Sequence, residues 1–301
     1  MAGELFDKNI IVTGAGRGIG RAIALACATA GARVVVADFG VAFDGSAPDP
    51  SIAVGVVDEI AAQGGEAIGL SANVASKAGA AAIVGACQSA WGRIDGLACC
   101  AGIVRHRPFL ELTEADFDAV IAVHLKGHFL MYHGVLSAMA AQGTGGSLIG
   151  IGSGYVLGDP ARAPYRTAKA GIIALTQSVA LAGSEYGVRA NVISPIAETR
   201  LTQASQLPIA APPEDIAPMA VYLLSDRAEA ITGEVFSVFG KRIAVWGEAR
   251  ETGEVSQTTR WSPGEIDAAM PRLMVGRQAS HNPSPPLPDS AKPGAEPVSL
   301  G

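Results

Sequence analysis

Short apolar runs alternate with longer stretches of helical spacing from Ile10 to about Phe239. The runs that predict strands are Ile10–Thr13, Arg33–Ala37, Ala67–Leu70, Ile94–Cys99, Ser147–Ile151, Val188–Ile193 and Val235–Val238. Nearly continuous apolar character is typical of strands that are buried on both faces. Strands that alternate with helices indicate an α/β fold, in which a parallel sheet is covered by helices on both sides.

Residues that typically cap helices predict the starts of two helices. Thr113-Glu114-Ala115-Asp116 has the pattern of a capping box before a long helix. Pro213-Glu214-Asp215 places a proline and two acids in a first helical turn.

The alternation breaks at three places. Residues 39–50 are rich in Gly, Asp and Pro and predict a long loop after the second strand. Residues 241–273 are weakly patterned, and the stretch from Ser280 to Gly301 contains six prolines. We therefore expect an α/β domain over residues 1–240 and an arm over 241–275 that packs on the core or on a partner subunit. A Pro-rich disordered tail is expected over 276–301.

Composition excludes several classes of protein. The chain has 301 residues, of which 49% are hydrophobic, and a net charge of −6 without a Lys/Arg cluster, which argues against nucleic-acid binding. Cys27, Cys87, Cys99 and Cys100 form no CxxC pair, so they predict reduced thiols and a cytoplasmic location. No apolar run is long enough for a membrane span, and residues 1–9 lack the apolar run of a signal peptide.

The first strand runs into Thr13-Gly14-Ala15-Gly16-Arg17-Gly18-Ile19-Gly20, which opens a helix. Glycines let the backbone turn sharply and approach a pyrophosphate, and a helix N-terminus offers free N–H groups to phosphates. This placement between strand and helix indicates a dinucleotide site. The loop residues expected to bind the cofactor are Gly14, Arg17, Gly18, Ile19 and Gly20.

Asp38 ends the second strand, 18 residues after Gly20. A carboxylate there can hydrogen-bond the adenosine ribose hydroxyls and would repel a 2′-phosphate, so the residue indicates NAD(H) rather than NADP(H). Arg17 is a counterweight, since a cation in the glycine loop attracts a 2′-phosphate. We give Asp38 the greater weight because it stands at the ribose position itself.

Tyr165 and Lys169 are four residues apart on a predicted helix that runs to about Tyr186, so they share one face. A lysine ammonium stabilises a phenolate, and we expect it to lower the tyrosine pKa toward a range useful for proton transfer. Ser153 lies just past the strand Ser147–Ile151, where ligands of parallel sheets bind. Tyr165, Lys169 and Ser153 are therefore the candidate catalytic residues, with Lys169 also placed to hold the nicotinamide ribose.

With these motifs, residues 5 to 240 resemble the short-chain dehydrogenase/reductase family. The resemblance implies a doubly wound, Rossmann-type three-layer sandwich with a seven-stranded parallel sheet, and a homodimer or homotetramer. Asn191-Val192-Ile193-Ser194-Pro195 followed by Thr199 is similar to the loop that closes over the nicotinamide, with Thr199 on its carboxamide. Further cofactor contacts implied by the resemblance are Asn73, Val74, Cys100, Ala101, Gly102, Pro195 and Thr199.

A narrower resemblance is to the (3R)-hydroxyacyl-CoA dehydrogenase units of multifunctional β-oxidation enzymes and their bacterial single-domain relatives. The loop after Asp38, the stretch Val123–Gly127, the run Thr199–Thr202 and the extended C-terminus carry it. It implies hydride transfer between NAD and a secondary alcohol on a bulky apolar substrate such as a 3-hydroxyacyl-CoA. The alternatives are a hydroxysteroid or another hydrophobic alcohol and, in a different class, a non-catalytic nucleotide-binding scaffold subunit.

Cations at the pocket mouth should favour a CoA ester, and Leu201–Pro212 could line an apolar pocket. The candidate cations are Arg105, Arg107, Arg162 and Arg200, which could equally be solvated surface charges.

Four positions depart from the pattern that is common in the family. Cys99 and Cys100 stand in place of paired asparagines, and Asn73 in place of an aspartate. His124 stands where many relatives have an asparagine that bends a helix. His124 and His128 also have metal-pair spacing, but without a third ligand we expect no metal site.

Overall fold

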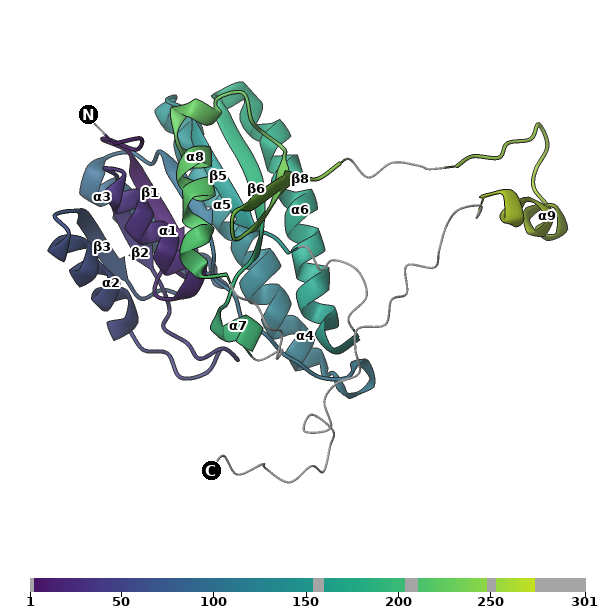
Figure 1. Cartoon of the computed structure of the whole chain (residues 1–301), viewed down its shortest axis with the longest axis horizontal. Coiled ribbons are helices and arrows are strands. Elements are labelled where there is room, and N and C mark those ends of the chain that lie inside the picture. The colour runs from purple at the N-terminus through teal and green to yellow at the C-terminus, as the bar shows by residue number, and fades with distance from the viewer. Residues whose placement is uncertain (1–2, 154–159, 204–210, 248–252, 274–301) are drawn as a thin grey trace. The chain divides into compact units, whose positions relative to one another are not determined.

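The computed structural model describes residues 3–153, 160–203, 211–247 and 253–273. Within them, a single sheet has the strand order β3-β2-β1-β4-β5-β6-β7-β8 (Figure 1). The strands are β1 Asn9–Thr13, β2 Arg33–Ala37, β3 Glu66–Leu70, β4 Gly96–Cys99, β5 Gly146–Ile151, β6 Val188–Ile196, β7 Val235–Phe239 and β8 Arg242–Val245. The seven predicted strands are confirmed, and they pair in parallel.

An eighth, antiparallel strand was not predicted. Phe239 pairs with Arg242, so a two-residue turn of Gly240 and Lys241 joins β7 to β8. Gly240 has a φ of +51°, which a tight hairpin of this length requires and glycine adopts without strain. The sheet therefore ends in a hairpin whose second strand lies beyond the predicted limit of residue 240.

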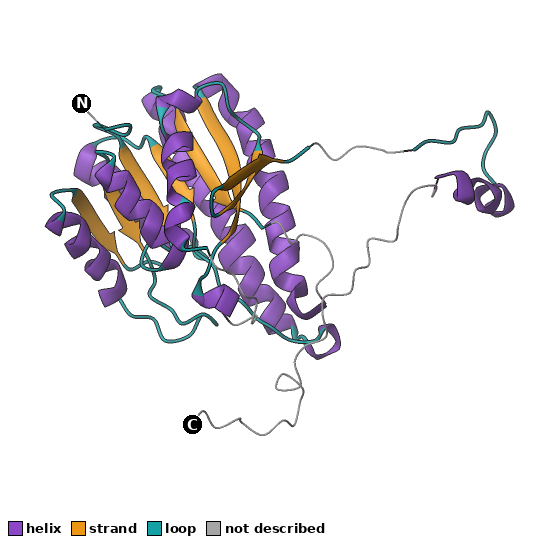
Figure 2. Ribbon diagram, viewed as in Figure 1, coloured by secondary structure: helices purple, strands orange, loops and turns teal. Residues whose placement is uncertain are grey.

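Helices cover both faces of the sheet, as Figure 2 shows. One face carries α1 Gly18–Thr29, α2 Ser51–Ala62 and α8 Ala217–Leu224, and the other carries α3 Lys77–Trp91, α5 Gly127–Gln142 and α6 Ala163–Gly183. Side chains alternate across the strands, so Ile10 and Val12 lie in the first core and Ile11 in the second. The predicted three-layer α/β architecture is confirmed.

The remaining described α-helices are short: α4 Glu114–Ile121, α7 Arg200–Gln203 and α9 Pro263–Leu273. The predicted capping box before α4 is present, since Thr113 Oγ1 accepts from Asp116 N and the Asp116 carboxylate accepts from Thr113 N. Pro213–Asp215 forms a separate 3₁₀ turn, and α8 begins two residues later at Ala217.

The chain divides into two compact units, Met1–Trp246 and Gly247–Gly301. The first unit holds the whole sheet, including β8. In the second, the described helix is α9, whose Ile266 and Met270 are exposed. Residues 276–301, predicted as a tail, lie outside the described residues, and the packing of the arm over 241–275 stays a prediction. No helix in the described part of the chain has the length and apolarity that a bilayer span requires.

The register of the sheet positions the functional residues. Thr13 at the end of β1 pairs with Ala37 at the end of β2 and with Cys99 at the end of β4. The segments that follow these three strands therefore leave the sheet side by side at one edge, where ligands of doubly wound folds bind.

Candidate active site

The glycine loop joins the end of β1 to the start of α1 at Gly18. Gly14 has a φ of +64°, and a Cβ there would lie 2.6 Å from the backbone nitrogen of Ala101. A Cβ on Gly20 would lie 2.1 Å from the carbonyl oxygen of Gly14. Both contacts are closer than any side chain allows, so glycine is required where this loop passes the segment after β4 and turns into the helix.

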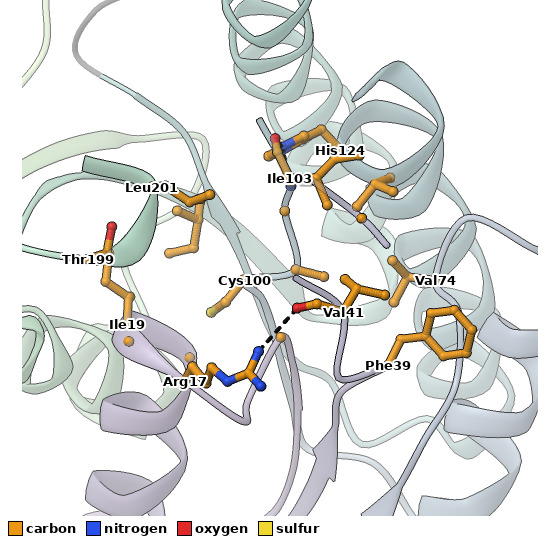
Figure 3. Close-up of a pocket in the computed structure, with 18 of the residues that line it drawn as sticks. Arg17, Ile19, Phe39, Val41, Val74, Cys100, Ile103, His124, Thr199 and Leu201 are labelled. Atoms are coloured by element: carbon orange, nitrogen blue, oxygen red, sulfur yellow. Dashed lines mark hydrogen bonds between the residues drawn. The ribbon is translucent and has the colours of Figure 1, made fainter. Parts of the chain in front are cut away.

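Asp38 follows β2 and faces the glycine loop. Its Oδ2 accepts a hydrogen bond from Gly16 N at 2.7 Å, and its Oδ1 accepts one from Gly40 N at 2.7 Å. These bonds fix the carboxylate beside the loop, where the sequence places the adenosine ribose. Arg17 reaches the same corner and donates to the carbonyl oxygen of Val41 at 3.1 Å (Figure 3).

The three candidate catalytic residues converge at the other end of the site. Tyr165 and Lys169 lie on α6, and the Lys169 Nζ is 5.4 Å from the centre of the Tyr165 ring. Lys169 is buried and donates to the carbonyl oxygen of Ile151 at 2.6 Å. Ser153, also buried, hydrogen-bonds the Tyr165 side chain. The predicted grouping of hydroxyl, phenol and ammonium is therefore present.

The expected lowering of the Tyr165 pKa is not found in the protein alone. Burial raises the pKa of Tyr165, against smaller lowering effects from the charge of Arg162 and the hydrogen bond of Ser153. Burial also lowers the pKa of Lys169 to about 8, against smaller opposite effects of Cys100 and Cys99. The expectation took account of the neighbouring charge and left out the desolvation of both groups.

This lysine predicts how stability depends on pH. Its ordinary pKa of 10.5 falls to about 8 on folding, so the full cost of the buried charge is present below pH 8. The cost is relieved as the pH rises toward 10.5, because the unfolded chain then binds more protons. Between pH 8 and 10, we expect the free energy of unfolding of wild type to gain about 2 kcal/mol relative to Lys169→Met.

Denaturant unfolding of both ligand-free proteins at these pH values measures the difference. Tyr165 and the other titrating groups are common to the two proteins, so their contributions largely cancel. Parallel pH profiles for wild type and Lys169→Met would show that Lys169 keeps an ordinary pKa.

His124 lies in a π-helical turn, Ala122–Lys126, between α4 and α5. Its ring is buried beside Tyr165, edge to face at a centroid distance of 5.2 Å, and its Nε2 meets the backbone of Ile103. His128 Nδ1 donates to the carbonyl oxygen of His124 at 2.6 Å. The pKa of each imidazole is lowered by burial and, to a smaller extent, by the charge of Lys169. Both rings are thus neutral and held by the protein backbone.

The three other departures, Cys99, Cys100 and Asn73, lie in or beside the same site. Cys100 faces the cavity in Figure 3, and burial raises the pKa of its thiol to about 12, so it is a neutral thiol at neutral pH. Cys99 is fully buried behind it. Asn73 Oδ1 accepts from Ala75 N at 2.9 Å, which fixes the turn that leads into α3.

These residues enclose a cavity of about 420 Å³, in the range of small-molecule sites. Every predicted cofactor residue lines it: Gly14, Arg17, Gly18, Ile19, Gly20, Asp38, Asn73, Val74, Cys100, Ala101, Gly102, Tyr165, Lys169, Pro195 and Thr199. Pro195 belongs to β6, which extends beyond its predicted end at Ile193. Predictions from sequence missed Phe39, Val41, Gly45 and Ile103, which line the cavity from a loop and from the segment after β4, whereas Arg105, a predicted cation of the pocket mouth, does line it.

Residues 14–240 match the family model described as enoyl-(acyl carrier protein) reductase. The chain belongs to the short-chain dehydrogenase/reductase family. It is therefore an oxidoreductase of a family that uses NAD or NADP.

Relatives of this short-chain dehydrogenase include the hydroxyacyl-CoA dehydrogenase ChsB1 of Mycobacterium tuberculosis. It is 34% identical over 298 residues, covering 91% of this chain and 90% of the relative. The peroxisomal multifunctional enzyme type 2 of Mus musculus is 35% identical over 237 residues, covering 77% of this chain and 32% of that larger protein. The narrower resemblance seen in the sequence is confirmed.

Among solved structures, a short chain dehydrogenase from Mycobacterium avium superposes with a TM-score of 0.83 at 40% identity. The match covers 92% of this short-chain dehydrogenase and 97% of the other chain. It shows that the order of the parallel strands described above is the fold of the family.

Proposed function

We propose that this protein is an NAD-dependent dehydrogenase that interconverts a secondary alcohol and a ketone on a 3-hydroxyacyl-CoA. The observation that carries the proposal is the junction of Ser153, Tyr165 and Lys169 beside a cavity lined by the glycine loop. An idle nucleotide-binding subunit has no physical need for a buried lysine beside a partly buried, hydrogen-bonded tyrosine. The scaffold alternative is therefore the weaker one.

The residues of the cavity fit a dinucleotide, because Gly14, Gly18 and Gly20 line it without side chains, and the backbone at Gly14 and Gly20 packs too closely for a Cβ. That loop and the first turn of α1 would hold the diphosphate, Asp38 the adenosine ribose and Thr199 the nicotinamide end. When bound, NAD accepts the hydride from the substrate carbon.

The protein residues handle the proton and the substrate oxygen. Ser153 donates a hydrogen bond to the oxygen and positions the alcohol beside Tyr165. The Tyr165 oxygen removes the hydroxyl proton in oxidation and returns it in reduction. Lys169 stabilises the phenolate by its charge, and the Ile151 carbonyl fixes the orientation of its ammonium group. His124 supports the Tyr165 ring by an edge contact.

NAD is favoured over NADP by the position of Asp38. Its carboxylate is held by two backbone N–H groups at the corner where the adenosine ribose would lie. A 2′-phosphate there would meet this negative charge, while ribose hydroxyls can donate to it. Arg17 is the residue that could attract a 2′-phosphate and so favour NADP, but one of its donors bonds the Val41 carbonyl.

The choice of a CoA ester is supported by the named activity of ChsB1 and by the multifunctional relatives. Of the candidate cations, Arg105 and Arg107 pair with Asp116 at 3.5 and 3.3 Å, while Arg105 and Arg200 line the cavity. Arg162 acts electrostatically on Tyr165. Leu201 lines the cavity, whereas 204–210 of the predicted apolar segment lie outside the described residues. A hydroxysteroid or another hydrophobic alcohol is the second candidate, because the apolar lining fits it equally.

Initial rates of NADH formation test the proposal. Purified protein is assayed with 3-hydroxyacyl-CoA esters of several chain lengths, free hydroxysteroids and simple secondary alcohols, each with NAD and with NADP. We expect turnover of CoA esters with NAD. Turnover of steroids or simple alcohols alone would overturn the CoA assignment and keep the chemistry. A preference for NADP would contradict the role given to Asp38.

The proposal also covers the cellular location, the oligomeric state and the ligands of the enzyme. The four cysteines are unpaired, as expected of a cytoplasmic protein. The resemblance to the family supports a homodimer or homotetramer. The ligands are the dinucleotide and a small-molecule substrate, with no role for nucleic acid, a membrane or a metal ion.

A further inference from the structure

The connection between β2 and α2 is long, running from Asp38 to Pro50, whereas such connections usually have about 2–6 residues. Its two ends lie together: a Cβ on Gly40 would stand 1.8 Å from the Asp49 carbonyl oxygen. At the tip, Ala42 N donates to Ser46 O at 2.8 Å and Gly45 N to Ala42 O at 2.9 Å. The segment is thus a compact loop with closed ends and its own internal bonds, a kind of loop that often has a function.

The tip of this loop is tied to the segment that follows β4. Val104 N donates to the Phe43 carbonyl oxygen at 3.0 Å, and the Arg105 guanidinium donates to the Asp44 carbonyl. The Val41 side chain packs in the cluster that contains Ile103 and Tyr165. The loop therefore crosses from the end of β2 to the far wall of the cavity.

A second tie joins the same loop to both ends of the predicted dinucleotide site. The Val41 carbonyl oxygen accepts from Arg17 Nη1 at 3.1 Å and from Arg200 Nη1 at 3.4 Å. Arg17 belongs to the glycine loop, and Arg200 begins α7 directly after Thr199. A carbonyl oxygen has two lone pairs, so one atom can hold both arginines. In Figure 3 a dashed line marks the hydrogen bond between Arg17 and the Val41 carbonyl.

We propose that the loop 38–50 is a strap across the dinucleotide cleft and that the Arg17–Val41–Arg200 junction is its latch. The proposal rests on the proposed function, because it takes the cavity as the dinucleotide site. The glycine loop forms the floor of the cavity, and Val41, Phe39 and Gly45 line it from the strap. A dinucleotide on that floor leaves only after the strap lifts, so the latch slows its dissociation.

The latch also connects the two ends of the proposed dinucleotide site, because it joins α7 to the strap. Arg200 follows the residue assigned to the nicotinamide, and its bond to Val41 ends at the adenosine side. Any displacement of Arg200 with α7 would break this bond and loosen the strap. Arg200 is in this sense a positioning residue, which acts on the cofactor through the strap and not on the reacting atoms.

A direct role of Arg200 on the cofactor phosphates is the competing explanation. A guanidinium that binds a phosphate accelerates association and makes affinity depend on ionic strength. A guanidinium that binds a neutral carbonyl changes mainly the dissociation rate, and salt affects it little. Arg105 separates the two explanations, since its tie to Asp44 belongs to the strap tip and not to the glycine loop.

Stopped-flow displacement of bound NADH, followed by its fluorescence, measures both rate constants in the full-length protein. Arg200→Met and Arg105→Met keep much of each apolar stem and remove the donors. We expect each to accelerate NADH dissociation about fivefold to tenfold, with association changed less than about twofold and little effect of salt. Cleavage by a protease within 39–50 should accelerate in the same two variants.

Two arginines serve as matched controls. Arg107 pairs with the same Asp116 as Arg105, and no hydrogen bond joins its side chain to the strap in the described part of the chain. Arg227 is exposed in the 3₁₀ turn before β7. Arg107→Met and Arg227→Met should release NADH at the wild-type rate, and thermal unfolding of all four variants checks their folding.

The outcomes separate the strap from the proposed function. Normal NADH binding with unchanged dissociation in Arg200→Met and Arg105→Met overturns the strap alone. A salt-dependent loss of association confined to Arg200→Met assigns this arginine to the phosphates, which also overturns the latch. A wild-type protein that binds neither NADH nor NADPH overturns the proposed function, and the strap with it.

Discussion

Replacing Tyr165 by phenylalanine is expected to lower the turnover number about 10³-fold while leaving NADH affinity within about twofold of wild type. A positioned general acid or base contributes about 10²–10⁴-fold. Phenylalanine keeps the ring that packs against His124 and removes only the oxygen that bonds Ser153. Initial rates with the best substrate of the panel and a fluorescence titration with NADH measure the two effects.

The matched control is Tyr132→Phe. Tyr132 is fully buried, and its hydroxyl bonds Thr176 Oγ1 at 2.9 Å; neither residue is among those that line the cavity. We expect it to lose about 1 kcal/mol of stability and to keep its turnover. If the Tyr165 variant turned over substrate at the wild-type rate, the proton-transfer role would be wrong and the scaffold alternative would gain support.

Replacing Gly14 by alanine is expected to destabilise the protein by about 3 kcal/mol and to weaken NADH binding more than tenfold. A left-handed residue with a Cβ costs about 1–2 kcal/mol, and steric overpacking adds about 1–3 kcal/mol. The added Cβ would lie 2.6 Å from the Ala101 nitrogen, so the glycine loop or the segment after β4 must move. Urea unfolding and an NADH titration give the two numbers.

Gly64→Ala isolates the contribution of the close contact. Gly64 has a similar left-handed φ of +80°, but nothing lies within 4 Å of its added Cβ. Its variant should lose only the conformational part, about 1 kcal/mol, and bind NADH normally. Equal losses in the two variants would mean that backbone conformation, and not the approach to Ala101, sets the requirement for glycine at 14.

Local patterns in the sequence predict most of the fold. The seven parallel strands are continuous apolar runs, and the capping box at Thr113 is a short-range pattern, so both can be read from neighbouring residues. β8 has no such pattern: Arg242 and Ile243 are both exposed in a strand of four residues at the edge of the sheet. Its formation depends on pairing with β7, which periodicity does not record.

The candidate site divides in the same way. Residue type at a fixed spacing defines the glycine loop, Asp38 and the Tyr165–Lys169 pair, so these features can be recognised in the sequence. The contacts of residues 41–45 depend on backbone carbonyls, which any residue supplies, so no side-chain pattern signals them. The pKa direction of Tyr165 depends on burial by distant elements, which only the folded chain determines.

The β7–β8 hairpin changes what the protein presents to other molecules at that end of its sheet. Without β8, the outer edge of β7 would offer a five-residue row of unpaired N–H and C=O groups beside apolar side chains. The hairpin covers this row with a shorter strand that begins at a charged arginine. A short, charged edge is a poor template for an incoming strand, so the hairpin disfavours aggregation of copies of the chain by edge-to-edge strand pairing.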